Sequence, residues 1–128
     1  MVRMLPLLLA VMLPPCPSTP NCVSTQANDA VHSIAPISYR GSAAEAMAQV
    51  AAIISAMPRA TVVQRTPTSM RVEFRTRLFR FVDDVMFELD DAKKTIEFRS
   101  ASRVGRNDLG VNRKRMETIR ARFAEGGR

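Results

Sequence analysis

The sequence predicts an α+β fold, with an antiparallel sheet of about four strands and two helices packed on one face. Three observations lead to this prediction. Apolar residues recur at helical spacing in two segments, 42–57 and 112–123. Between these segments, residues 70–78 alternate between apolar and polar side chains, which is typical of a strand with one covered face and one wet face. A length of 128 residues fits one domain.

The first 13 residues carry one positive charge followed by an apolar run, as in a secretory signal. The run is shorter than the about 20 apolar residues that span a bilayer. Pro6 interrupts it, and no A-x-A cleavage pattern follows. We expect a leader over residues 1–13 and a single domain over residues 14–125, exported to the periplasm or cell envelope. Lipid attachment at Cys16 and a core segment of a cytosolic protein are the alternatives.

Residues 20–36 are rich in turn formers and predict an irregular arm. Cys16 and Cys22 are the two cysteines of the chain, and in an exported protein they would form a disulfide rather than remain free thiols. His32 lies in the arm, where a lone histidine is more often packed than catalytic. Two cysteines and one distant histidine match no metal-ligand spacing, so we expect no metal and no cofactor.

The helix over residues 42–57 begins at an S-x-x-E capping box formed by Ser42 and Glu45, and Pro58 ends it. Strand-like runs follow at residues 61–66, 70–78, 83–89 and 95–102. In the run 70–78, the inward set includes Thr76 and Leu78 besides the apolar residues before them.

The last two strands form a predicted hairpin. Alternation places Asp83 on the same covered face as Val85 and Phe87. With Asp91 and Ala92 at the tip of the turn, Asp83 faces Ser100, Asp84 faces Arg99, and Glu88 is kept away from Glu97, which avoids facing like charges.

The stretch 98–123 holds eight Lys/Arg against two Asp/Glu, a surplus of six in a chain whose net charge is +7. Its second half is the second predicted helix, over residues 112–123, which Asp108 or Asn112 could cap. So much positive charge favours an anionic partner.

Five segments resemble a known family: PNCVS (20–24), PRA (58–60), FVDDV (81–85), RSASRVG (99–105) and DLGVNRKR (108–115). They are similar to the bacterial and plastid domain-of-unknown-function family numbered 1499, and the likeness covers residues 16–123. The resemblance implies an exported or membrane-linked protein, but the family has no agreed activity, so no catalytic residue follows from it. Thr25 and Thr76 stand where a serine is usual in the family, and Arg106 where an aromatic residue is frequent.

The candidate site combines the end of the hairpin with the start of the second helix. A helix N-terminus and several arginines suit a phosphate, sulfate or carboxylate. Two interpretations follow: an ion-pair network that fixes the helix on the sheet, which paired charges of this kind more often form, and an anion-binding pocket as the functional alternative. The residues concerned are Asp83, Asp84, Arg99, Ser100, Ser102, Arg103, Asn112, Arg113 and Arg115.

For function, the sequence favours a binding or interaction module over an enzyme. Adjacent residues on a strand point to opposite faces, so Asp83 and Asp84 cannot flank one bond. No nucleophile-elbow or phosphate-loop motif is present. The alternative is a small hydrolase or lyase that uses Asp83, Ser100 and Arg103. The expected partner is an anionic small molecule, a lipid headgroup or an envelope protein, and nucleic acid is not expected.

Overall fold

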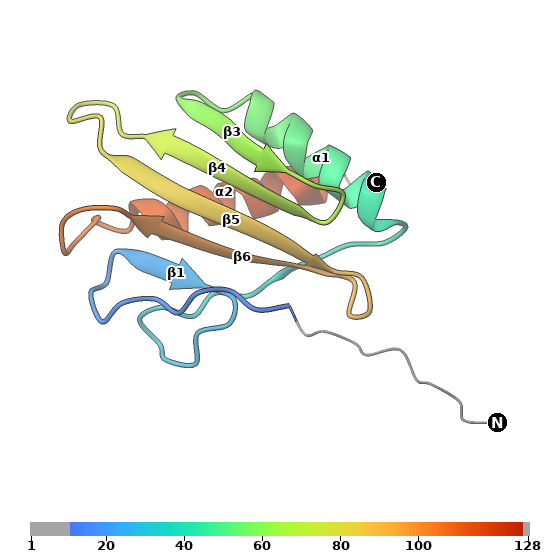
Figure 1. Cartoon of the computed structure of the whole chain (residues 1–128), viewed down its shortest axis with the longest axis horizontal. Helices are drawn as coiled ribbons and strands as arrows, with labels where there is room; N and C mark the ends of the chain where they lie inside the picture. The colour runs from blue at the N-terminus through green and yellow to red at the C-terminus, as the bar shows by residue number, and fades with distance from the viewer. Residues whose placement is uncertain (1–10, 127–128) are drawn as a thin grey trace.

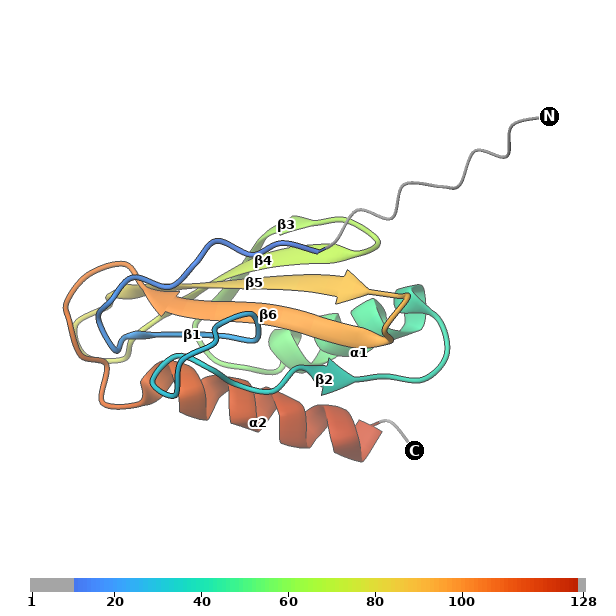
Figure 2. The ribbon, with the colours of Figure 1, turned by 90° about the horizontal axis from the view of Figure 1, so that it is seen from below.

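The computed structural model describes residues 11–126 and shows two helices and an antiparallel sheet, so the α+β prediction is confirmed (Figure 1). The described sheet has six strands rather than about four. Both helices lie on one side of it (Figure 2). The elements in chain order are β1 (Cys22–Ser24), β2 (Ile37–Ser38), α1 (Ala43–Ser55), β3 (Ala60–Arg65), β4 (Ser69–Arg75), β5 (Val82–Asp90), β6 (Thr95–Ser102) and α2 (Val111–Gly126).

Of the two additional strands, β1 lies in the arm over residues 20–36 that the sequence predicted to be irregular, and β2 follows directly after it. The strands run in the order β1-β6-β5-β4-β3, and β2 pairs with β6 on the edge that β1 also uses. Cys22 faces Ala101, and Ile37 faces Ile96. Strands of three and two residues are too short to show a period in the sequence. They form because the outer edge of β6 needs partners for its backbone groups.

The predicted register of the β5–β6 hairpin is wrong by two residues. Asp83 faces Ser102 and Asp84 faces Ala101. The turn has four residues between the last pair, Asp90 and Thr95, and Lys94 adopts a left-handed backbone conformation with φ 55°. The longer turn is held by Asp90, whose carboxylate accepts a hydrogen bond from the Lys93 backbone N–H at 3.2 Å.

The corrected register places Glu88 opposite Glu97, the pairing that the sequence argument had avoided. Burial raises the pKa of Glu88, which reduces the charge that this pair carries at mildly acidic pH. The hydroxyl of Thr25 donates to Oε1 of Glu97 at 3.0 Å. The arm therefore supplies a polar partner that makes the facing glutamates tolerable.

The core lies between the sheet and the helices. One buried cluster includes Val72, Phe87 and Phe98 from the sheet together with Val50 of α1 and Ile119 of α2. Strand β4 ends at Arg75, before the predicted inward residues Thr76 and Leu78. Leu78 is 83% exposed, because the chain turns away there to make the β4–β5 loop.

Side chains cap the N-terminal ends of both helices. Ser42 accepts a hydrogen bond from the Glu45 backbone N–H at 3.1 Å, as the capping box predicted. At the start of α2 the capping residue is Asp108, which accepts from the Asn112 N–H at 3.0 Å, whereas Asn112 itself lies in the first turn of the helix and is buried. No helix among residues 11–126 has the length and apolar character to cross a membrane.

Residues 1–10 of the predicted leader lie outside the described residues. Leu13, the last residue of that leader, is buried, and its N–H donates to Oε1 of Gln26 at 2.7 Å. The packed domain therefore already includes Leu13.

Candidate functional site

A buried ion pair joins β5 to α2. Nη2 of Arg115 lies 2.7 Å from Oδ2 of Asp83, and the two side chains are 9% and 3% exposed. The guanidinium also lies over the ring of Phe74, 4.6 Å from its centre. The face of the ring attracts the positive charge of Arg115 from a direction in which the guanidinium makes no hydrogen bond.

Asn112 is the centre of the polar network around this ion pair. Its Oδ1 accepts from the Ser100 hydroxyl at 2.6 Å and from Nη1 of Arg115 at 2.9 Å. Its amide nitrogen carries two hydrogens and donates to the Asp108 carboxylate at 2.8 Å and to the Ser102 hydroxyl at 3.0 Å, and it also lies 3.3 Å from the Asn21 carbonyl. Asn112 is 0% exposed, and both ends of its amide are therefore satisfied inside the protein.

Asp108 connects this network to the helix cap. Burial acts to raise the pKa of Asp108, but hydrogen bonds from the backbone and side chain of Asn112 and from the Gly110 N–H together lower it. The carboxylate is thus kept charged at the positive end of α2, where an anion is favourable.

A second ion-pair group lies on the opposite face of the sheet. Arg103 donates through Nε and Nη2 to the two oxygens of Asp84 at 2.8 and 2.9 Å, and Nη2 reaches Glu73 at 3.0 Å. The carboxylates raise the pKa of Arg103. This group is half-exposed, unlike the pair on the inner face.

The remaining predicted arginines contact backbone carbonyls of residues that precede β2. Nη2 of Arg99 donates to the Pro15 carbonyl at 3.3 Å, and burial lowers the pKa of Arg99. Arg113 donates to the carbonyls of Ser33 and Val31 at 2.9 and 3.0 Å. The nine predicted residues are therefore divided: the inner network holds Asp83, Ser100, Ser102, Asn112 and Arg115, whereas Asp84, Arg99, Arg103 and Arg113 lie elsewhere.

Asn21 and Glu73 were not among the predicted site residues, and Asp108 was predicted only as a cap of the second helix. Asn21 follows a proline in the segment PNCVS, and this pattern indicated only an irregular arm. Nδ2 of Asn21 donates to the Gly105 carbonyl at 2.8 Å, a contact 84 positions along the chain that no local pattern predicts. Glu73 is adjacent to Asp84 because the two face each other across β4 and β5.

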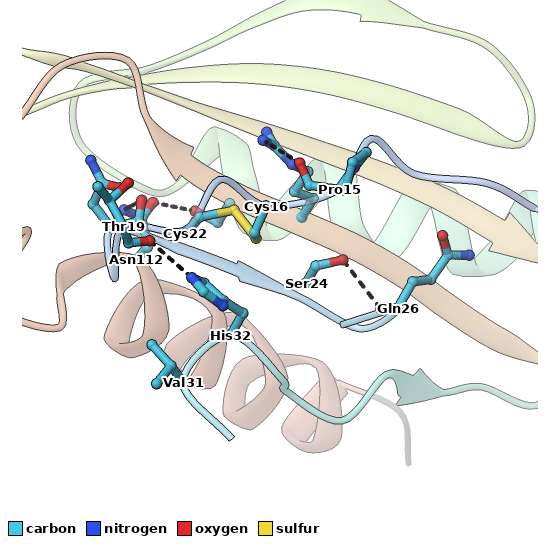
Figure 3. The surroundings of a disulfide bond; sticks show 12 residues. Pro15, Cys16, Thr19, Cys22, Ser24, Gln26, Val31, His32 and Asn112 are labelled. Carbon is cyan, nitrogen blue, oxygen red and sulfur yellow. Dashed lines mark hydrogen bonds between the residues drawn. A yellow bond between two sulfur atoms is a disulfide. The ribbon is translucent and has the colours of Figure 1, made fainter. Parts of the chain in front are cut away.

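Cys16 and Cys22 form the predicted disulfide, with an S–S distance of 2.00 Å (Figure 3). The small loop that it closes contains Thr19, whose carbonyl lies 2.9 Å from Nε2 of His32. Nδ1 of His32 lies 2.7 Å from Asp29. The bond to Thr19 raises the pKa of His32, burial opposes it, and Asp29 raises it further. His32 thus ties the disulfide loop to the rest of the arm.

The inner network has no arrangement for nucleophilic catalysis. The Ser100 hydroxyl donates to an amide oxygen, which is not a base, and Ser100 is 0% exposed. Arg103, its proposed helper, lies on the opposite face of the sheet. Within residues 11–126, no three side chains of the types His, Cys, Asp and Glu gather closely enough to hold a metal ion.

Beside this network, two adjoining surface hollows of about 380 Å³ each form what we call the basic groove. They lie where the α1–β3 turn, the end of β4 and the first turns of α2 meet. Arg59, Arg75 and Arg77 line both hollows. Lys114 and Arg115 line the first hollow, and Arg80 lines the second.

No curated protein and no solved structure matches the chain. A family model does match, and it carries the description "Protein of unknown function (DUF1499)". The match runs over residues 12–123, which includes every element of the sheet and the buried Asp83–Arg115 pair. The chain therefore belongs to the DUF1499 family, as its motifs predicted.

Proposed function

We propose that the protein is an exported binding module of the cell envelope, and that the basic groove binds an anionic group such as a phosphate or carboxylate. The observation that carries this proposal is the charge of the groove lining. Neither hollow is lined by an aspartate or a glutamate, whereas six cationic side chains line the two together.

The cations of the groove also have few partners inside the protein. Of the six, Arg115 pairs with Asp83. No carboxylate among residues 11–126 lies within 4.0 Å of the charged nitrogens of Arg59, Arg75, Arg77 or Lys114. Arginines with free donors, close to a helix N-terminus, are a suitable environment for an oxyanion. The buried network behind them keeps the start of α2 in place.

Export rests on different support. The first 13 residues have the pattern of a secretory leader, and disulfides persist in oxidising compartments. Mass spectrometry of the protein from its own host tests this part: we expect a mature chain without its first residues. An intact N-terminus in a cytosolic fraction would contradict export.

Titration of the protein with phosphate, sulfate and citrate, followed by amide NMR shifts, tests the groove. Chloride at the same ionic strength is the reference, so that general screening is subtracted. We expect saturable shifts at residues 75–77 and 111–114. The R77Q/K114Q variant should lose them, whereas R40Q/R122Q removes two exposed arginines outside the groove and should keep them. Equal shifts with chloride, or equal effects of both variants, would contradict the proposal.

A further inference from the structure

Large apolar side chains are exposed in two loops at one end of the sheet. In the β4–β5 loop, residues 76–81, Leu78 is 83% and Phe79 73% exposed. In the β6–α2 loop, residues 103–110, Leu109 is 84% exposed. Both loops project from the same end of the molecule (Figure 1). We call these three residues, together with Phe81, the apolar tips.

Local bonds hold the loops with their tips directed outward. The β4–β5 loop is closed by the Thr76 N–H, which donates to the Phe81 carbonyl at 2.8 Å. The rings of Phe79 and Phe81 stack on each other at 5.5 Å instead of entering the core. Leu109 adopts a left-handed backbone conformation with φ 55°, which is uncommon outside glycine, and its N–H donates to Oδ1 of Asn107 at 2.8 Å.

Positive charge is interleaved with the apolar tips. The first loop reads Thr-Arg-Leu-Phe-Arg-Phe, with Arg77 and Arg80 on either side of its two most exposed residues. Arg106 lies in the second loop. Asp108 is the one acidic residue of the two loops, and its carboxylate is engaged by the backbone N–H groups of Gly110 and Asn112. The end of the molecule is therefore both apolar and basic.

We propose that this end of the protein docks on a bilayer that contains anionic phospholipids. The apolar tips enter the interfacial region, while Arg77, Arg80 and Arg106 stay at the level of the headgroup phosphates. A bilayer fits better than a protein partner because the apolar residues stand on two separate projecting loops and alternate with arginines, which suits a fluid charged surface. The apolar tips belong to the docking surface alone, whereas Arg77 and Arg80 also line the basic groove.

Vesicle co-sedimentation tests the docking. We expect the protein to bind vesicles of phosphatidylcholine mixed with phosphatidylglycerol, to bind pure phosphatidylcholine weakly, and to lose affinity as salt screens the arginines. R77Q/R80Q should weaken binding by about fivefold for each arginine removed. R40Q/R122Q, with two exposed arginines outside the loops, is the matched control.

The apolar part is tested by L78S/F79S, which should abolish stable binding because charge alone does not anchor the loops. M12S/V31S removes two apolar residues that lie outside both loops and are 83% and 55% exposed, and it should bind as the wild type does. Binding of L78S/F79S at the wild-type level would overturn the proposal. So would an absence of binding to either kind of vesicle by the folded wild-type protein.

Fluorescence gives a direct readout of insertion, since the chain has no tryptophan. The emission of the F79W variant should shift to shorter wavelength on anionic vesicles and be quenched by brominated acyl chains, while the emission of V31W should do neither. An unshifted F79W emission on vesicles that bind the protein would overturn insertion of the loop. Anion titration of L78S/F79S separates the two proposals, because this variant keeps the six cations of the groove and should still show the anion-dependent shifts while it no longer binds vesicles.

Discussion

Arg115 and Asp83 meet inside the protein, with Nη2 of the arginine 2.7 Å from Oδ2 of the aspartate. Each comes from a different element, α2 and β5, so one buried contact fixes how the helix lies on the sheet. Nη1 of the arginine also donates hydrogen bonds to the Ser100 hydroxyl and to Oδ1 of Asn112. Removal of any one partner therefore leaves buried charge or polar atoms without compensation.

Asp83→Ala should destabilise the protein by about 3–5 kcal/mol, because it leaves the Arg115 charge buried and unpaired. Arg106→Ala, in an exposed loop, should stay within about 0.5 kcal/mol. Urea unfolding of both variants measures the difference. The double variant D83L/R115M removes both charges and should be more stable than D83A alone. If Asp83→Ala unfolds at the wild-type midpoint, the pair is not structural.

Asn112→Ala should cost more than Ser100→Ala. The first change removes the acceptor of the Ser100 hydroxyl and one partner each of the Ser102 hydroxyl and Nη1 of Arg115, with a cost of about 1–3 kcal/mol for each group that stays unsatisfied. After the second change, Oδ1 of Asn112 still accepts from Arg115. Thermal unfolding of the two variants decides this, and a larger loss for Ser100→Ala would contradict the central place of Asn112.

The contribution of His32 to stability should depend on pH. Both of its ring nitrogens face acceptors, Asp29 and the Thr19 carbonyl, so the bonds are complete when both nitrogens carry a proton. The pKa of His32 is raised above the ordinary 6.5, although Arg113 nearby opposes this. When the pKa is raised in the folded state, the protonated histidine contributes its full stabilisation at pH values below the unfolded-state pKa. This stabilisation is lost as the pH rises through the folded-state pKa.

The free energy of unfolding should be measured in urea at pH values from below 6.5 to above the folded-state pKa of His32. Over this range it should fall with rising pH more steeply in the wild type than in His32→Gln. An identical pH profile for the two proteins would show that the histidine is not linked to folding.

Reduction of the Cys16–Cys22 bond should lower the free energy of unfolding by about 2 kcal/mol, as expected for a short closed loop. The loop also positions Thr19 and Asn21 for their contacts with His32 and the Gly105 carbonyl. Urea unfolding with and without dithiothreitol measures the effect, and C16S/C22S should not respond to the reductant. An unchanged midpoint for the reduced wild type would contradict this prediction.

Much of the fold was predictable because its long elements carry a strong period. The buried faces of β4 and β5 follow from strict alternation, which also placed Asp83 on the covered face beside Val85. The strands β1 and β2 were not predictable, since two or three residues carry no period. The hairpin register depended on a four-residue turn with Lys94 in a left-handed conformation, and lysine gives no signal for that conformation.

The sequence predicted which part of the chain forms the site, but not which arginine pairs with which aspartate. The ion-pair interpretation predicted that Arg99, Arg103 or Arg113 neutralises the two aspartates. Arg103 does pair with Asp84, but Asp83 pairs with Arg115, a choice that depends on how far the helix is rotated about its axis. Arg113, two positions earlier, instead contacts the arm through the carbonyls of Val31 and Ser33. Such a rotation is set by packing of the whole helix and not by any local motif.

The pairing of the arm with β6 has a consequence for the order of folding. Asn21 and the Gly105 carbonyl that it binds are 84 positions apart, and β1 has no strand partner until β6, which ends at Ser102, is in place. Hairpins between neighbouring strands close short loops, whereas docking the arm closes a loop of 84 positions. We expect the arm to dock last and to open first. In amide hydrogen exchange, the Thr25 and Tyr39 N–H groups, which donate to the carbonyls of Phe98 and Lys94, should lose protection before the amides of Val85 and Phe87 do.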